Sequence, residues 1–185
     1  LVLRGIFMLR RWELEWFYQE GCSRLFPDAW EQFLAPIPVV ERHDLISSFH
    51  RRLTSEDEAT RLDAARAWSV WEGATSFLRV DHDFVTGHQD AAFALAFARI
   101  ENHYFVNGGF FEVEDQLLRD AHRIAHIPGV IVHGRYDVVC PLANAWDLHK
   151  VWPKAELVIS PVSGHSAFEP EHVDALVTAT DKFAP

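Results

Sequence analysis

The segment VIVHGRYDVVCP, residues 130–141, determines how the C-terminal part of this chain folds. Its aliphatic start, Val130 to Val132, predicts a buried strand that continues into His133 and Gly134. Asp137 follows at the point where the chain has to leave the strand. Because a buried carboxylate is costly unless it is paired, Asp137 needs either a partner or a function.

Strands and helices alternate through the rest of the C-terminal part. GVIVHG (129–134) and AELVIS (155–160) are predicted strands, and LANAWDLHKVW (142–152) and EPEHVDALVTATDKF (169–183) are predicted helices, with Pro170 near the start of the second. This alternation predicts parallel strands with right-handed crossovers, which defines an α/β fold.

A histidine follows the second strand in the turn SGHSAFEP (163–170). In open α/β sheets, functional sites gather at the carboxyl ends of the strands, where both Asp137 and His165 are expected. Taken alone, Asp137 could cap the next helix and His165 could be a hydrogen-bonded loop histidine. Together, in this order, they favour two members of a hydrolytic triad.

Composition restricts the class of protein. The 185 residues are 49% hydrophobic and 13% aromatic, enough for a sizeable core, and no segment has the pattern of a signal peptide or the ~20 apolar residues of a membrane span. Two distant cysteines give no disulfide framework and favour a reducing, cytoplasmic setting. A net charge of −10 disfavours nucleic-acid binding and weakly favours a cationic ligand.

The N-terminal residues LVLRGIF form an apolar, strand-like run that lacks an initiator Met. Since a strand needs neighbours to pair its backbone groups, we expect the chain to begin in the middle of a fold, with a segment missing upstream. The predicted organisation is a core strand at 1–8, a helical cap domain at 9–123, and the C-terminal part of an α/β core at 124–185.

The predicted cap is rich in Trp and Phe. Helices are expected at 11–21, 27–34, 54–73 and 90–105. The third should begin at Thr54 or Ser55 and end at Gly73. In the fourth, an apolar stripe of Phe93, Phe97, Ile100 and Tyr104 is predicted to form cap core.

A nucleophile is the missing member of the triad. The pentapeptide G-x-S-x-G does not occur in the chain. In α/β-hydrolases the triad follows the order Ser, Asp, His, so the nucleophile should precede Asp137. We therefore expect a Gly-x-Ser-x-Gly elbow encoded upstream of Leu1.

Seven segments together resemble the proline iminopeptidases (prolyl aminopeptidases) of the α/β-hydrolase fold. They are LRGIF (3–7), WFYQEG (16–21), WSVWEG (68–73), FARIENHYF (97–105), HGRYDVVCP (133–141), NAWDLHKVWP (144–153) and SGHSAFEP (163–170). The resemblance implies a cofactor-free and metal-free serine peptidase in which Asp137 orients the imidazole of His165, the general base. It also implies that the serine and most of the oxyanion hole lie outside this chain, so the chain alone should be inactive.

The resemblance further implies a peptide substrate with an N-terminal proline, whose protonated amine must be paired with carboxylates. Glu72 and Glu101 fit the amine-binding glutamates of the family. The pocket lining of the family fits Arg4, Phe7, Phe17 and Cys140. At Phe17 related enzymes often carry Tyr, so the hydrogen bond of that hydroxyl is absent here.

Other interpretations follow from the same residues. Either glutamate could be a solvated helix residue, and the spacing of His122 and His126 imitates a zinc pair but lacks the Glu and the third ligand of a zinc site. Another capped α/β-hydrolase, such as an esterase or an epoxide hydrolase, and a non-catalytic binding protein are the alternative functions. Neither a nucleic-acid nor a membrane partner is predicted, and the sequence leaves the oligomeric state open.

Overall fold

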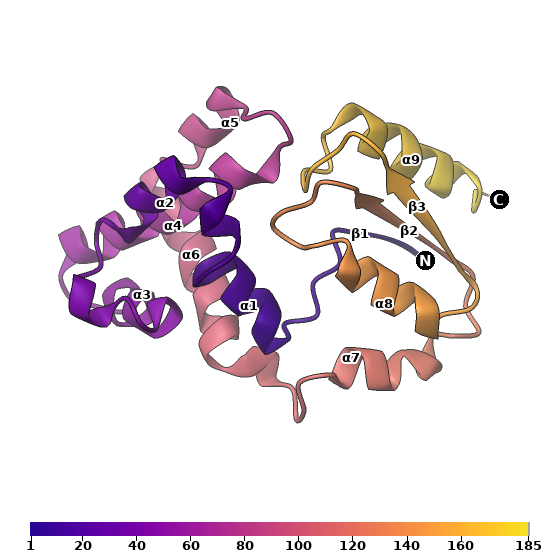
Figure 1. Cartoon of the computed structure of the whole chain (residues 1–185), viewed down its shortest axis with the longest axis horizontal. Helices are drawn as coiled ribbons and strands as arrows, with labels where there is room; N and C mark the ends of the chain where they lie inside the picture. The colour runs from indigo at the N-terminus through magenta and orange to yellow at the C-terminus, as the bar shows by residue number, and fades with distance from the viewer. Residues whose placement is uncertain (185) are drawn as a thin grey trace. The chain divides into compact units, whose positions relative to one another are not determined.

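A parallel sheet of three strands forms the core of the first of two compact units (Figure 1). The computed structural model describes residues 1–184, of which this unit comprises residues 1–13, 76–79 and 112–184. The strands β1 (Val2–Arg4), β2 (Gly129–Gly134) and β3 (Ala155–Ser160) lie in the order β1-β2-β3, and all pairs are parallel. Both C-terminal strands lie at their predicted positions.

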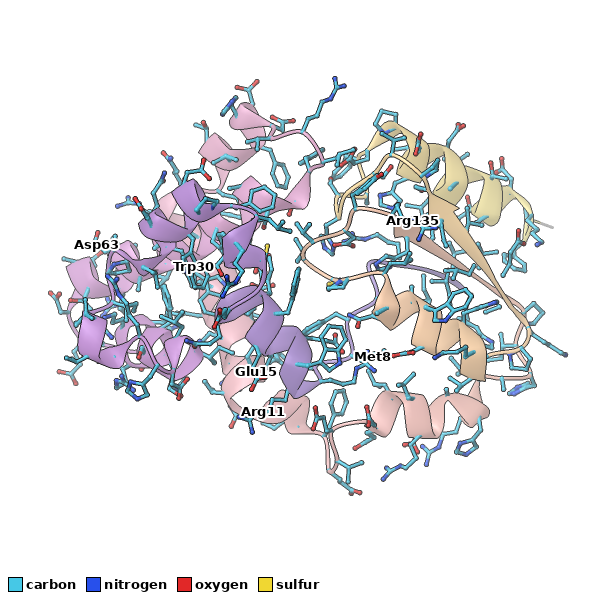
Figure 2. The ribbon with its side chains drawn as sticks, in the orientation of Figure 1. Met8, Arg11, Glu15, Trp30, Asp63 and Arg135 are labelled. Carbon is cyan, nitrogen blue, oxygen red and sulfur yellow. The ribbon has the colours of Figure 1, made fainter. Side chains whose placement is uncertain are left out.

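Side chains alternate between the two faces of the sheet, as the pleat of a strand requires. Ile131 of β2 packs on one face in a cluster with Met8 (labelled in Figure 2), Leu148 and Trp152. Val130 and its neighbour two residues on, Val132, pack on the other face in a cluster with Ala179. The two faces therefore bury different sets of residues.

Helices cover these faces. Leu148 belongs to α8 (Ala143–Val151), and Ala179 belongs to α9 (Pro170–Asp181), so each cluster joins the sheet to one of these helices. Before β2, the chain forms the short helix α7 (Gln116–Arg119) and a 3-10 turn, η4 (Asp120–Arg123). Strand, helix, strand, helix is the predicted order for this part.

The second unit, residues 14–75 and 80–111, is helical. Its helices are α1 (Arg11–Tyr18, which begins in the first unit), α2 (Pro27–Leu34), α3 (Leu45–Leu53), α4 (Glu58–Ser76), α5 (His82–Gly87) and α6 (Ala91–Val106), with 3-10 turns η1 (Cys22–Arg24), η2 (Val39–Glu41) and η3 (Gly108–Phe110). Its core is aromatic: Trp68 stacks on Tyr18, Phe33 stacks on Phe49, and Trp30 (Figure 2) meets Trp71 edge-on.

Helix α4 differs from the prediction at both ends. It begins at Glu58, where the Asp57 carboxylate accepts hydrogen bonds from the backbone N–H and hydroxyl of Thr60, so neither Thr54 nor Ser55 is the cap. Gly73, predicted to end the helix, lies inside it. A Cβ at Gly73 would approach Cγ of His88 to 2.9 Å. The glycine therefore makes room for a packed ring and does not stop the helix.

The predicted burial of the apolar stripe on α6 was wrong. Phe93, Ile100 and Tyr104 are 45%, 61% and 49% exposed, whereas Ala94 and Ala98 are fully buried. The small residues belong to the face that carries Asn102, whose side chain donates to the Ile46 carbonyl of α3 (2.9 Å) and bonds to His50 of the same helix (2.8 Å). Alanines allow the two helices to approach closely, and phenylalanines would not.

The predicted fold class, α/β with parallel strands and a large helical part, is confirmed. Within residues 1–184, no helix combines the length and the apolar character that would be required to cross a membrane.

Candidate active site

Asp137 and His165 meet at the carboxyl ends of β2 and β3. Nδ1 of His165 lies 2.9 Å from Oδ2 of Asp137. Because a carboxylate only accepts, Nδ1 carries a proton, and in the neutral ring Nε2 presents a lone pair. The Asp137 side chain is 1% exposed and that of His165 is 18% exposed, so the imidazole is reachable while its partner is not. This is the arrangement of a general base with a buried orienting carboxylate.

The other carboxylate oxygen of Asp137 has a separate role. Oδ1 accepts hydrogen bonds from the backbone N–H groups of Val139 (3.1 Å) and Cys140 (2.8 Å). Capping of the turn and orientation of His165 are therefore carried out by different oxygens of one side chain.

Two glycines make room for the ring and the loop of His165. Gly5 follows β1 with a φ of +56°, and a Cβ there would lie 3.1 Å from Cε1 of His165. A Cβ at Gly134 would overlap the carbonyl oxygen of Gly164. Because glycine accepts positive φ and has no side chain, the end of β1 and the end of β2 both pass close to the loop that carries His165.

Further hydrogen bonds hold this loop in place. Arg4 donates Nη1 to the carbonyl oxygen of His165 (2.7 Å), and the backbone N–H groups of His165 and Ser166 both donate to the carbonyl of Ser76 (2.9 and 2.8 Å). The buried carboxylate of Glu169 accepts from the backbone N–H of Gly164 (3.0 Å) and from that of Leu78 (2.6 Å). Arg4, predicted as pocket lining, therefore contacts the backbone of His165.

Glu72 and Glu101 form a pair of carboxylates within the helical unit. Tyr18 donates its hydroxyl to Oε1 of Glu72, and Trp68 donates Nε1–H to Oε2 of Glu101 (2.9 Å). Burial, together with the charge of Glu101, raises the pKa of Glu72 well above its usual range. Burial also raises the pKa of Glu101, to about 7. A positive charge placed beside two such carboxylates would favour their ionised forms.

The remaining predicted residues lie as follows. Phe17 is buried, edge-on to Tyr18 and in contact with Trp71. Phe7 is half-buried in the segment after β1. The buried Cys140 acts through its backbone, donating N–H to Asp137 and accepting at its carbonyl from the ring of His133 (2.7 Å).

Sequence reasoning missed three side chains. Tyr18, next to Phe17, supplies a hydroxyl to Glu72, and Trp68 supplies an indole N–H to Glu101. The spacing of four residues between Trp68 and Glu72 marks a shared helix face, which was a usable signal. His133 lies 3.4 Å from Asp137, and its position near the carboxyl end of a predicted strand was the signal for it. No cluster within residues 1–184 joins three His, Cys, Asp or Glu side chains into a potential metal site.

A parallel sheet with an Asp–His pair at its carboxyl edge, accompanied by a large helical part, defines a partial α/β-hydrolase core with a helical cap. No protein-family model matches the chain. The chain is 85% identical over 184 residues to a proline iminopeptidase of Xanthomonas citri, which covers 100% of this chain and 59% of the relative. Proline iminopeptidases of Arabidopsis thaliana and Neisseria gonorrhoeae are 52% and 44% identical, over 98% and 100% of the chain and 48% and 58% of the relatives.

The chain belongs to the proline iminopeptidase family, and the resemblance drawn from its motifs is confirmed. It spans between about half and three fifths of the length of these relatives.

Proposed function

We propose that this chain is part of a serine aminopeptidase that releases proline from the N-terminus of peptides. The observation that carries the proposal is the bond between Nδ1 of His165 and the buried carboxylate of Asp137, which leaves Nε2 as a base. His165 would take the proton of a serine hydroxyl as that oxygen attacks the carbonyl carbon. It would then return the proton to the leaving amine, and Asp137 would stabilise the imidazolium formed in between.

The same proposal assigns Glu72 and Glu101 to the protonated amine of the substrate. An N-terminal proline carries a secondary ammonium with two N–H groups, which suits two acceptors. The raised pKa of each glutamate supports this assignment, because a cation placed between them would relieve the cost of their burial. Phe17, Phe7, Arg4 and Cys140 would line the pocket. A neutral ester substrate would have no use for these carboxylates.

Two parts of the proposal rest on the sequence. The helical residues 9–123 would serve as the cap of the core, and the reducing, cytoplasmic setting predicted from the cysteine content is part of the same proposal. Peptides would be the substrates, with no nucleic-acid or membrane partner. The ring of His165 bonds to Asp137, and a test of activity also needs the serine nucleophile that the proposal invokes.

A chimaera provides the serine nucleophile. The aligned residues of this chain replace the matching segment of the Xanthomonas citri relative, which supplies the rest of the protein. We expect the chimaera to release proline from a proline-amide fluorogenic substrate. Asp137→Asn should lower kcat about 10⁴-fold, and His165→Ala should abolish turnover. Activity that survives His165→Ala would contradict the triad assignment.

The glutamates are tested by charge removal. Glu72→Gln and Glu101→Gln should each lower kcat/KM for the proline amide by about 30- to 1,000-fold, as a buried ion pair loses one partner. Hydrolysis of p-nitrophenyl acetate, which has no amine, should stay near the parent rate. Glu31→Gln, at an exposed position of α2, is the matched control. Equal loss on both substrates, or a change below about twofold, would show that the glutamates are structural. Ester hydrolysis without proline release would favour another capped α/β-hydrolase.

A further inference from the structure

His133 is a buried histidine beside the candidate triad that the proposed mechanism leaves without a role. It is the penultimate residue of β2 and is fully buried. Its Nδ1 lies 3.4 Å from the backbone nitrogen of Ile6, and its Nε2 lies 2.7 Å from the carbonyl oxygen of Cys140. The same Nε2 is 3.4 Å from Oδ2 of Asp137. The ring therefore connects the segment after β1 with the loop that carries the carboxylate.

These partners fix the tautomer of the ring. A carbonyl oxygen only accepts, so Nε2 of His133 must carry the proton that is directed at Cys140. A backbone N–H only donates, so Nδ1 must present its lone pair to Ile6. Both conditions are met by the neutral imidazole and by no other form. Burial lowers the pKa of His133 despite the nearby charge of Asp137, which agrees with a neutral ring.

The segment that contacts Nδ1 is itself held firmly. The carbonyl oxygen of Ile6 accepts a hydrogen bond from Nδ2 of Asn144 (3.0 Å), and Oδ1 of Asn144 accepts from Nη2 of the buried Arg10 (2.9 Å). Glu13 closes this network by accepting from both Arg10 (2.7 Å) and Asn144 (2.9 Å). Because each of these buried polar groups is satisfied, the network is rigid, and the backbone N–H that orients His133 has a fixed position.

We propose that His133 is a positioning residue for the Asp137–His165 pair. Its N–H donates to the carbonyl of Cys140 and lies 3.4 Å from the Asp137 oxygen that binds His165. The loop that carries the carboxylate is thereby held in place, and the partial positive charge of the N–H moderates the basicity of Asp137 toward His165. The role in a reaction rests on the proposed function, whereas the hydrogen-bond geometry does not. A buried histidine that only fills space would explain the burial but not a fixed tautomer whose N–H binds the Cys140 carbonyl beside the carboxylate.

The charged and titratable groups around His133 are few. Asp137 and His165 face it from the loops after β2 and β3, and His172 faces it from α9. The ring of His172 bonds through Nδ1 to the carbonyl of Ser166 (2.8 Å). Arg4 lies beside His165, to whose carbonyl oxygen it donates a hydrogen bond. If a substitution at His133 shifts the titration of the Asp137–His165 pair, the shift must therefore arise from its effect on these groups.

The test compares two kinds of substitution in the chimaera. His133→Leu removes both ring nitrogens at similar volume. His133→Gln places an amide N–H where Nε2–H lies, so it retains the donor. His149→Leu is the matched control, since His149 also bonds to a backbone carbonyl of the first unit, that of Ala155 (3.0 Å), but does not contact the pair. The readouts are the NMR signal of the proton between His165 and Asp137, followed against pH without substrate, and the pH profile of kcat/KM.

Without the N–H of His133, the Asp137 carboxylate should stabilise the imidazolium of His165 more strongly. We expect His133→Leu to move the NMR titration and the acidic limb of kcat/KM upward by about half a pH unit or more. Above that limb, kcat should fall about tenfold, as for other losses of an orienting side chain, with KM within about twofold. His133→Gln should stay close to the parent in all of these, and His149→Leu should leave both pH midpoints in place.

An unchanged titration in His133→Leu, with kcat within about twofold of the parent, would overturn the proposal, as would a His149→Leu variant that shifts equally. If His133→Leu fails to fold, His133→Asn carries the same test, because its amide reaches only the position of Nδ1. Absence of proline release from the chimaera would refute the proposed function alone, since the NMR titration needs no substrate.

Discussion

The half-buried carboxylate of Glu101 provides a prediction in which function and stability oppose each other. It is half-buried on α6, and its one described hydrogen bond comes from the indole N–H of Trp68. The pKa of Glu101 is raised from 4.5 to about 7, chiefly by burial. Glu101→Gln removes the charge and keeps an oxygen that can accept from Trp68.

The sign of the effect follows from proton binding. Between pH 4.5 and about pH 7 the folded protein holds this proton more tightly than the unfolded chain does. Stability contributed by this group is therefore present below pH 4.5 and is lost as the pH rises through about 7. At about 1.4 kcal/mol per pH unit the full shift corresponds to on the order of 3 kcal/mol, and we expect about 2 kcal/mol after allowing for solvent screening at a half-buried site.

The expected result is a stabilised variant that has lost function. At pH 8, the free energy of unfolding of Glu101→Gln in the chimaera should exceed that of the parent by about 2 kcal/mol, and at pH 5 by less than about 1 kcal/mol. Urea unfolding at pH 5, 6.5 and 8 measures both values. Glu31→Gln, exposed on α2, controls for removal of a surface charge and should change stability by less than about 0.5 kcal/mol.

Two results would refute this reasoning. A Glu101→Gln variant that is equal to or less stable than the parent at pH 8 would show that burial imposes no cost on the ionised carboxylate. An equal gain at pH 5 and at pH 8 would show that the gain is unrelated to ionisation. The stabilisation is predicted whatever ligand the unit binds, so the measurement stays separate from the assay of proline release.

Four further substitutions in the chimaera, measured by urea unfolding, test the packing within each of the two units. Glu169→Ala should cost about 2–3 kcal/mol, because two backbone N–H groups lose their acceptor; a change below about 0.5 kcal/mol would contradict this. Gly134→Ala should be more damaging, at about 3 kcal/mol or more, since its methyl group overlaps a backbone carbonyl; a stable variant would show that the His165 loop can move aside. On α6, Ala98→Leu should cost about 1–3 kcal/mol, whereas Ile100→Ala should be nearly neutral; the reverse order would restore the apolar stripe as core.

The hydrophobic pattern of the C-terminal residues predicted most of the α/β core. Aliphatic runs bounded by turn residues mark β2 and β3, and the helices between them require parallel pairing. Parallel strands bring their carboxyl ends to one edge, so an Asp after one strand and a His after the next were predicted to meet, and the bond between Asp137 and His165 has that geometry. Such inferences work because strand direction and alternation are local properties of the sequence.

Only the tertiary structure decided which helix faces are buried. On α6 the hydrophobicity of Phe93 and Ile100 indicated a core face, but close contact with α3 requires the small side chains of Ala94 and Ala98. The end of α4 was decided in the same way, since the ring of His88 packs over Gly73. Glycine and alanine have two uses, as flexible or weakly apolar residues and as space for a neighbour, and the sequence does not show the neighbour.

The partners of the charged groups were also decided by the tertiary structure. Sequence motifs pointed to Asp137, Glu72 and Glu101, yet the donors that hold them come from distant segments or from residues without a motif. Tyr18 reaches Glu72 from another helix, and the role of His133 depends on a backbone N–H that lies beyond the end of β1. A hydrogen bond needs its two atoms about 3 Å apart at a favourable angle, and for groups far apart along the chain only the fold sets that distance.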